Sequence, residues 1–311
     1  MPDALCLEKQ YSTTKLVTTE KPNIFNNLED KFETVLFLPE GENRKGEGGL
    51  RTKGYFKKSY DGKPLISIIT VVYNGEKYLE ETIQSVINQT YDNVEYIVID
   101  GGSTDETVDI IKKYEGQIDY WMSERDNGIS DAFNKGITAS TGIRLLFLNA
   151  GDHFYNDEVL VNLQSIFIEN SDIDLIYGKI MLVNSNRKEI KAYGKEQNFN
   201  VLRRHMTLPH QAMFHHNSFF KKNGLYDINI KTSMDYDLIM KNFKDIKFYF
   251  IDKIISNMLS DGVSQTHITK LYKEHLAIQL RYQLNAPIRS YFYFGLNIFS
   301  FHLKKIIKRY L

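Results

Sequence analysis

Three short apolar runs, each followed by a polar cluster, constrain the fold of this chain more than any other feature. The runs are Leu65–Val72, Val94–Ile99 and Arg144–Leu148. They are rich in Ile, Val, Leu and Phe, which is typical of strands buried on both faces of a parallel sheet. Helical periodicity separates them, and a capping box of Ser103 and Glu106 opens the second helix. This order predicts a doubly wound α/β sheet with right-handed crossovers.

The polar clusters that follow the runs predict where a ligand binds. They are Tyr73-Asn74, Asp100-Gly101-Gly102-Ser103 and Asn149-Ala150-Gly151-Asp152. In open α/β sheets, ligands bind beyond the carboxyl ends of the strands. We therefore expect the functional site at this edge.

Composition narrows the class of protein. The 311 residues are 42% hydrophobic and 13% aromatic, with a formal net charge of zero, so no global basic field favours nucleic acid. The single cysteine, Cys6, excludes an internal disulfide and fits a reducing compartment. The chain starts without a secretory signal pattern and has no run of about 20 apolar residues, so we expect a cytoplasmic protein.

Three regions are expected. Residues 1–63 are polar and mixed, and we interpret them as an N-terminal extension packed loosely on the domain. Their Gly46 and Gly48 do not make a dinucleotide fingerprint, because Arg51 stands where the third glycine belongs. Residues 64–262 form the main domain, and residues 263–311 a C-terminal helical region.

Several residues at the strand ends are candidates for binding a nucleotide. Val72, Tyr73, Asn74 and Glu76 would form a rim, although a turn that starts the next helix explains the same residues. The Asp100 carboxylate would accept hydrogen bonds from a base or a ribose, or it caps a turn.

A second group of candidates lies in the polar segment 126–136, which opens a helix. Asp126, Asn134 and Lys135 would contact the nucleotide sugar, and a solvated helix face is the alternative.

The cluster Asn149-Ala150-Gly151-Asp152 suggests a divalent cation. A hard cation takes few protein oxygens and completes its shell with water or substrate phosphates, so one aspartate and a diphosphate suffice. A tight turn would give the same sequence.

Together these residues resemble the nucleotide-binding half of family 2 glycosyltransferases with the GT-A fold. The motifs are YNGEKYLEETIQSVINQTY, VIDGGSTDET, DNGISDAFNKGI and FLNAGD, between Pro64 and Asp157. The resemblance implies an inverting hexosyl- or N-acetylhexosaminyl-transferase that uses a nucleotide sugar, usually a uridine diphosphate sugar. It also implies an acceptor that is a glycan or a lipid-linked saccharide, in bacterial surface polysaccharide or lipopolysaccharide assembly.

The resemblance also assigns roles. Asn149 to Asp152 occupy the family's Asp-x-Asp position, so Asp152 is the expected ligand of Mg or Mn, with Asn149, Ala150 and Gly151 near the donor. The family often has an arginine where this chain has Phe133, so Lys135, Arg125 or the metal would neutralise the diphosphate.

Asp235 falls on the aspartate of the family's Glu-Asp motif, with Met234 in place of the glutamate, and is the expected catalytic base. Asp237 lies two residues on, so it faces another side of the helix. Capping by Asp235 is the structural alternative.

Three further features stay open. Histidines at 153, 205, 210, 215 and 216 invite a zinc site, but none shows the helical His-x3-His pair, and Pro209-His210-Gln211 resembles the family's acceptor-side strand instead. The loop Asp261–His267 would close over the donor, where His267 touches the diphosphate or only begins a helix.

The tail is the third open feature. Leu303, Ile306, Ile307 and Tyr310 form an apolar stripe beside Lys304, Lys305, Lys308 and Arg309. Such a helix lies on the cytoplasmic face of the inner membrane, or it docks on protein. A metal-dependent nucleotidyltransferase and a non-catalytic sugar-nucleotide binder remain alternative functions.

Overall fold

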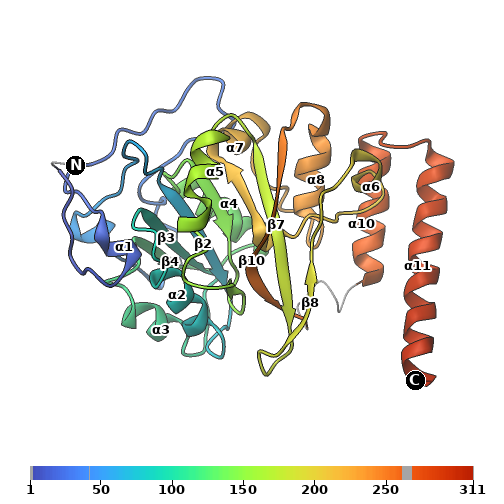
Figure 1. Cartoon of the computed structure of the whole chain (residues 1–311), viewed down its shortest axis with the longest axis horizontal. Helices are drawn as coiled ribbons and strands as arrows, with labels where there is room; N and C mark the ends of the chain where they lie inside the picture. Colours follow the sequence, from blue (N-terminus) through green and yellow to red (C-terminus); the bar gives the residue numbers. More distant parts are fainter. Residues whose placement is uncertain (1–2, 42, 261–267, 311) are drawn as a thin grey trace.

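The computed structural model describes residues 3–41, 43–260 and 268–310. It contains a ten-stranded sheet with the strand order β1-β4-β3-β2-β5-β9-β7-β10-β6, and β8 pairs with β7. Figure 1 shows this sheet running through the middle of the molecule, with α2 and α3 below its left half and α10 and α11 beyond its right end.

The strands differ greatly in length. Their bounds are β1 Gly46–Gly48, β2 Ile66–Val72, β3 Val94–Asp100, β4 Tyr120–Ser123, β5 Arg144–Phe147, β6 His153–Phe154, β7 Leu175–Val183, β8 Glu189–Tyr193, β9 Met213–His216 and β10 Phe248–Leu259.

The helices follow the same numbering. The α-helices are α1 Ser12–Lys15, α2 Leu79–Ile87, α3 Thr107–Lys113, α4 Ile129–Ala139, α5 Gln164–Glu169, α6 Phe199–Leu202, α7 Asn217–Asn223, α8 Met234–Lys241, α10 Ile268–Arg281 and α11 Pro287–Tyr310. Short 3₁₀ turns are η1 Arg51–Lys53, η2 Val161–Leu163, η3 His210–Ala212 and η4 Phe243–Asp245.

The parallel centre of the sheet is formed by the three predicted strands and β4. β2 pairs with β3 along its whole length and with β5 on its other side, and β3 pairs with β4. Every residue of β2 and β3 is buried, which explains why both read as continuous apolar runs. Their carboxyl ends meet at one edge, as predicted from the sequence.

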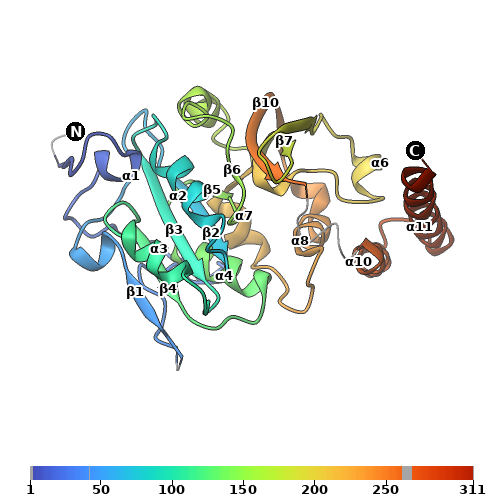
Figure 2. The same ribbon diagram turned by 90° about the horizontal axis from the view of Figure 1, so that it is seen from below.

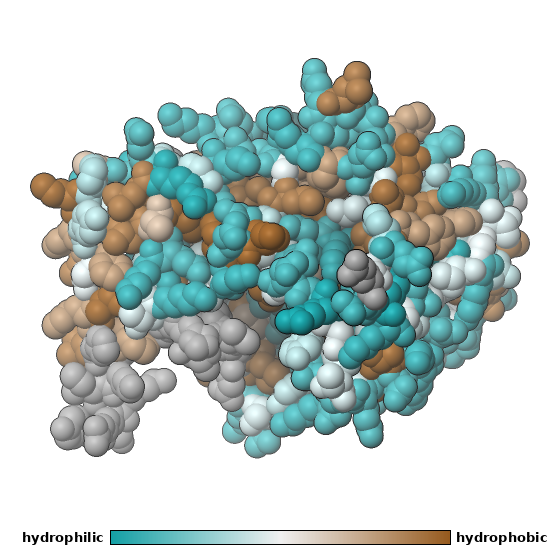
Figure 3. All heavy atoms as spheres, turned by 180° about the vertical axis from the view of Figure 1, so that it is seen from behind, coloured by the Kyte–Doolittle hydropathy of each residue, from teal (hydrophilic) through white to brown (hydrophobic). Residues whose placement is uncertain are grey.

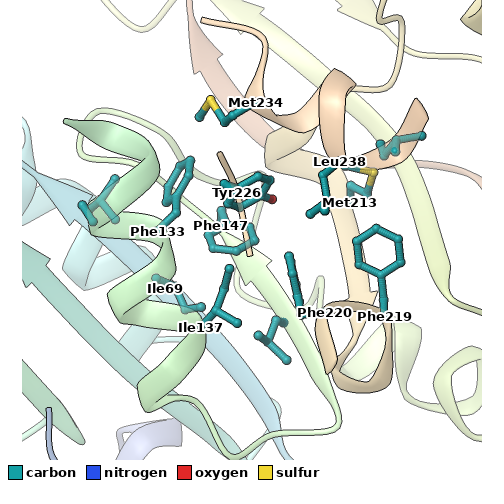
Figure 4. Packing of buried hydrophobic residues seen from close by; sticks show 14 of the residues in the cluster. Ile69, Phe133, Ile137, Phe147, Met213, Phe219, Phe220, Tyr226, Met234 and Leu238 are labelled. Atoms are coloured by element: carbon teal, nitrogen blue, oxygen red, sulfur yellow. The ribbon is translucent and has the colours of Figure 1, made fainter. Parts of the chain in front are cut away.

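Each face of the sheet carries its own core. Successive strand residues point to opposite faces, so Ile66 and Ile68 pack under α2, whereas Ile69 packs under α4. Figure 4 shows Phe133 and Ile137 of α4 lying against Phe147 and Tyr226 in the second of these cores. The core under α4 therefore continues into the half of the molecule that contains α8.

That half of the sheet is partly antiparallel. β9 runs antiparallel to both β5 and β7, while β7 and β10 run parallel to each other. The carboxyl ends of β7 and β10 therefore lie at the same edge as those of β2, β3 and β5. Figure 2 looks onto this edge, with β1 and β4 on one side and α10 and α11 on the other.

The N-terminal extension is not loosely packed, so that expectation is wrong. β1 pairs with β4, and Gly46 and Gly48 lie against the Trp121 ring. Buried Arg51 pairs with buried Glu95 of β3 at 2.5 Å. A buried ion pair of this kind needs further hydrogen bonds, which Ser67 and Thr141 supply to Glu95. Residues 44–51 are thus an integral part of the sheet.

The predicted capping box is also absent. α3 begins at Thr107, so its N-cap residue is Glu106 and not Ser103, and the N-cap side chain makes no capping hydrogen bond. Ser103 instead donates its hydroxyl to Asp100, and Asp105 accepts from the backbone and the hydroxyl of Thr107. Among the described residues, no helix combines the length and apolar character needed to cross a bilayer.

Candidate active site

The loops that follow β2 and β3 are joined to each other by hydrogen bonds. The Asn74 backbone donates to Ser103 Oγ at 2.7 Å, and Asn74 Oδ1 accepts from the Thr104 backbone at 2.9 Å. Glu76 accepts from the Glu106 backbone at 3.1 Å. The side chains of Asn74 and Glu76 therefore shape the two loops, and a nucleotide would meet the surface that they build.

Val72 and Tyr73 differ sharply in exposure. Val72 is buried, and its carbonyl accepts from the Gly101 backbone at 2.9 Å. Tyr73 is 64% exposed. Of these two residues, only Tyr73 therefore offers its side chain to a ligand at the sheet edge. An exposed aromatic ring is a surface on which a base can stack.

Asp100 is completely buried and uses its carboxylate within the chain. It accepts from the backbones of Gly102 and Ser103 at 3.1 and 3.0 Å and from Ser123 Oγ at 2.6 Å, besides the Ser103 hydroxyl. Such a carboxylate organises the loop. Replacing it with alanine would leave several buried donors without an acceptor, at about 1–3 kcal/mol each. The role of Asp100 at the base stays a prediction.

Asp126 contacts the loop that follows β3. Its Oδ1 accepts from the Gly128 backbone at 2.8 Å, and its Oδ2 lies so close to Gly101 that a Cβ there would overlap it. The loops after β3 and β4 are therefore in contact, and the Asp126 carboxylate faces the space between them.

Asn134 and Lys135 do not form the simple solvated helix face that was the alternative to nucleotide contact. Asn134 exchanges two hydrogen bonds of 2.9 Å with the backbone of Tyr226, which ties α4 to the other half of the molecule. Lys135 pairs with Glu124 at 2.8 Å and lies 3.8 Å from Asp131. Two carboxylates already compensate the charge that we expected to neutralise a diphosphate.

Asn149 to Asp152 form a tight turn. The Asp152 backbone donates to the Asn149 carbonyl at 2.9 Å, and Gly151 has a φ of 103°, which favours glycine. Thr82 of α2 fixes the turn by accepting from the Gly151 backbone and donating to the Asp152 carbonyl at 2.7 Å. The buried Oδ1 of Asn149 has no hydrogen-bond partner in the described part of the chain.

The Asp152 side chain is only 6% exposed. Burial raises its pKa to about 7. Hydrogen bonds from the Gln211 side chain and the Leu259 backbone, and the positive charge of Arg187, lower the pKa but do not offset the effect of burial. A carboxyl held in this way is poised to ionise when a cation or another compensating charge arrives.

Asp235 and Asp237 have different environments, as their spacing predicted. Burial raises the pKa of Asp235 to about 6, and the carboxylate accepts only from the adjacent Tyr236 backbone at 2.8 Å among the hydrogen bonds of the described residues. Asp237 is buried and accepts from Arg281 and from the Tyr282 hydroxyl, both at 3.1 Å. Asp237 thus holds α8 against α10, whereas Asp235 keeps hydrogen-bonding capacity.

The short turn η3 connects the surroundings of the two carboxylates. Gln211 hydrogen-bonds Asp152, and the preceding His210 lies 3.3 Å from the Tyr226 hydroxyl. Burial, together with the charge of Asp235, holds the pKa of Tyr226 well above its usual range. Asp152 is therefore linked to η3 through Gln211, and Asp235 through Tyr226 and His210.

Two histidines of this region, His210 and His215, pack among aromatic core residues. His210 stacks on Phe147 with ring centroids 4.9 Å apart, and His215 packs against Phe219 and Phe220. Burial lowers the pKa of His210 to about 4. Within residues 3–41, 43–260 and 268–310, no three His, Cys, Asp or Glu side chains are grouped to hold a metal ion. His267 lies outside the described residues.

Sequence reasoning missed the basic residues that reach this edge from distant segments. Lys45 donates to the carbonyls of Gly102 and Ser103, both at 2.8 Å, and Arg44 pairs with Glu124 at 3.1 Å. Arg187, in the turn between β7 and β8, donates to the Gly151 carbonyl at 2.9 Å. No local pattern signals such contacts, because the partners are far apart in the sequence.

Comparisons of this chain with known proteins identify its family. The profile described as "Glycosyl transferase family 2" matches residues 67–228, just over half of the chain. The chain belongs to glycosyl transferase family 2. It is a glycosyltransferase, and the assignment favours sugar transfer over the nucleotidyl transfer that the sequence had left open.

Curated relatives carry related names. A "PGL/p-HBAD biosynthesis glycosyltransferase" of Mycobacterium tuberculosis is 28% identical over 231 residues, which cover 72% of this chain and 89% of that protein. A glycosyltransferase of Rickettsia prowazekii that is named uncharacterized is 30% identical over 201 residues, which cover 62% and 63%.

Solved structures show that the fold is GT-A. S. aureus TarS 1-349 in complex with UDP has a TM-score of 0.57 at 20% identity, over 75% of this chain and 70% of that one. The mannosyltransferase PcManGT from Pyrobaculum calidifontis, in complex with GDP-Man and Mn2+, has a TM-score of 0.53 at 13% identity, over 78% and 76%.

Proposed function

We propose that this family 2 glycosyltransferase transfers a sugar from a UDP-sugar to a hydroxyl of a glycan or a lipid-linked saccharide, with inversion. The observation that carries the proposal is a pair of carboxyls linked to η3, the buried Asp152 and the partly buried Asp235. Their pKa values are raised to about 7 and about 6. Titratable groups with pKa values shifted in this way are candidates for an active site.

Asp235 is proposed as the general base. It removes the proton of the acceptor hydroxyl while the new bond from that oxygen to the anomeric carbon forms. The bond from the same carbon to the diphosphate oxygen breaks on the opposite face, so the configuration inverts. A base with a pKa of about 6 is ionised at pH 7 and still accepts a proton well.

Asp152 is proposed to hold Mg or Mn. The residues fit such an ion, because Asp152 offers a carboxylate and the Asn149 Oδ1 is a buried oxygen without a hydrogen bond in the described region. When bound, the ion would supply Lewis-acid stabilisation to the departing diphosphate. The complex of PcManGT with Mn2+ supports this proposal.

The remaining donor contacts are proposed from position. Tyr73 and Asp126 face the carboxyl edge where the base and ribose would lie, and the complexes of TarS with UDP and with UDP-GlcNAc support a uridine nucleotide. Val72, Asn74, Glu76, Asn134 and Lys135 would act mainly by shaping the loops, given the contacts that they make.

A donor screen tests the proposal. Purified enzyme with Mn²⁺ should hydrolyse or transfer from UDP-sugars faster than from GDP-, ADP- or CDP-sugars, measured as release of the nucleoside diphosphate. Faster turnover of a GDP-sugar would refute the assignment of UDP, and turnover of none would refute the proposed reaction.

We further propose that α11 places the enzyme on an anionic membrane surface, such as the cytoplasmic face of the inner membrane. The helix exposes an apolar stripe at helical spacing, formed by Ile288, Phe292, Leu296, Phe299 and Leu303. Figure 3 shows apolar side chains gathered at the edge of the molecule where α10 and α11 lie. No acidic residue occurs from Pro287 to Leu311, but five Lys and Arg do. Apolar stripe and positive charge together suit an anionic bilayer.

Replacing two exposed rings of this stripe tests the membrane proposal. Phe292→Ser with Phe299→Ser should weaken binding to phosphatidylglycerol vesicles at least tenfold, because each ring buried in lipid contributes about 1.5–3 kcal/mol. Ile190→Ser, at an exposed site on β8, is the matched control and should bind normally. Unchanged vesicle binding in the double variant would remove α11 as a membrane element. A change in oligomeric state would make the stripe a protein interface instead.

A further inference from the structure

We propose that Arg187, in the turn between β7 and β8, binds the diphosphate of the donor. This inference rests on the proposed function of the site. It concerns the charge that neutralises the diphosphate, which the sequence left open between Lys135, Arg125 and the metal. Lys135 is paired with Glu124.

The position of Arg187 is determined by its turn. The backbone of Arg187 donates to the Asn184 carbonyl at 2.9 Å, and Asn184 Oδ1 accepts from the backbones of Asn186 and Lys188, each at 3.0 Å. Figure 1 shows the β7–β8 turn at the lower end of the molecule, beyond the carboxyl ends of the strands. The turn thus directs its residues toward the edge that carries Asp152.

Arg187 has a left-handed backbone conformation, with a φ of 61°. A non-glycine residue in this region costs of order 1 kcal/mol or more, and such residues cluster at ligand sites. In this backbone conformation, the Arg187 side chain reaches the turn after β5, where it contacts Gly151.

The guanidinium is held next to the proposed metal ligand. It donates at 2.9 Å to the carbonyl of Gly151, the residue before Asp152, and it pairs with Glu81 of α2. Its Cζ lies 5.6 Å from the centre of the Tyr78 ring. A guanidinium has five N–H donors, so these two contacts leave donors for phosphate oxygens.

Exposure allows the ligand to reach it. The Arg187 side chain is 23% exposed, and Glu81 is 43% exposed. Glu81 can therefore turn into solvent when the diphosphate takes its place. In this arrangement Glu81 holds the guanidinium ready in the absence of donor, and Arg187 stabilises the negative charge that develops on the leaving diphosphate.

Nucleotide titrations of Arg187→Gln test the assignment. UDP should bind about 10- to 100-fold more weakly than to the wild type, the loss expected for a charge-assisted hydrogen bond. UMP binding should change little, since the contact is to the phosphate nearest the sugar. Lys188→Gln removes the same charge from the next, exposed residue of the turn and should leave UDP affinity unchanged. Arg187→Lys should retain part of the affinity, because it keeps the charge.

Three results would overturn the proposal. They are an unchanged UDP affinity in Arg187→Gln, an equal loss of UDP and UMP affinity, and an equal loss in Arg187→Lys and Arg187→Gln. The last two would make Arg187 a structural link between the hairpin and α2. A wild type that binds no UDP would instead refute the proposed donor, so the two failures are distinguishable.

Discussion

Asp235→Asn should lower turnover by about 10²–10⁴-fold at saturating donor, with little change in UDP affinity. Asparagine keeps the shape of the side chain and its contact with the Tyr236 backbone, but it cannot accept the proton of the acceptor hydroxyl. Steady-state kinetics with a glycan acceptor would measure kcat, and calorimetry would measure the affinity for UDP.

Asp237→Asn is the matched control on the same helix. Asp237 accepts from Arg281 and Tyr282 of the neighbouring α10 segment, so its loss should lower thermal stability while turnover of the folded enzyme stays near the wild-type value. A collapse of turnover confined to Asp237→Asn would transfer the role of base to that residue. Normal turnover in both variants would eliminate the mechanism.

The same base predicts a pH dependence. Because burial raises the pKa of Asp235 to about 6, the free enzyme loses the active carboxylate as pH falls through this value. A plot of kcat/KM against pH should therefore decline below about pH 6, and this decline should be missing from the residual activity of Asp235→Asn.

The second large effect is expected for Asp152→Asn, which should abolish metal-dependent binding of the donor. The variant should also be more stable than the wild type at pH 8. Burial raises the folded-state pKa of Asp152 to about 7, above its ordinary value of 3.8. The ionised carboxylate therefore destabilises the fold above pH 7, by at most about 4 kcal/mol for a shift of this size.

This stability difference gives Asp152→Asn a signature that activity alone lacks. It should be largest at pH 8 without metal and should shrink as pH falls toward 4, because the wild-type carboxyl is then neutral. Thermal melts at several pH values would measure it, with exposed Asp157→Asn as the control. Full activity of Asp152→Asn, or of the wild type with a chelator, would exclude the metal-dependent mechanism.

The parallel centre of the fold was predictable because its signal is local. The bounds of β2, β3 and β5 lie within one residue of the apolar runs, since strands buried on both faces are apolar at most positions. β1 was missed because three residues with two glycines carry no such pattern. Its place depends on the Trp121 ring, which is remote in the sequence.

The sequence predicted which types of residue lie near the candidate site. It was less informative about the contacts that each of these residues makes. Asp100, Asn134 and Lys135 lie at the carboxyl edge, but each is engaged with residues that no local pattern connects to it. Motifs pointed to Asp152 and Asp235 as candidates, whereas none pointed to Arg187, because its turn sequence gives no sign of the contact with Gly151. The sequence predicts which side chains could act, and the tertiary contacts decide which are free to do so.

The pairing of β1 with β4 has a consequence for the order of events during synthesis. Gly46–Gly48 leaves the ribosome before its partner Trp121–Ser123 and can pair only after that strand has emerged. Arg51 can likewise form its ion pair only after Glu95 has emerged. Residues 46–51 therefore reach these native contacts only after β3 and β4 have been made. Until then β4 is an unpaired sheet edge, which is the kind of surface that other chains and chaperones bind.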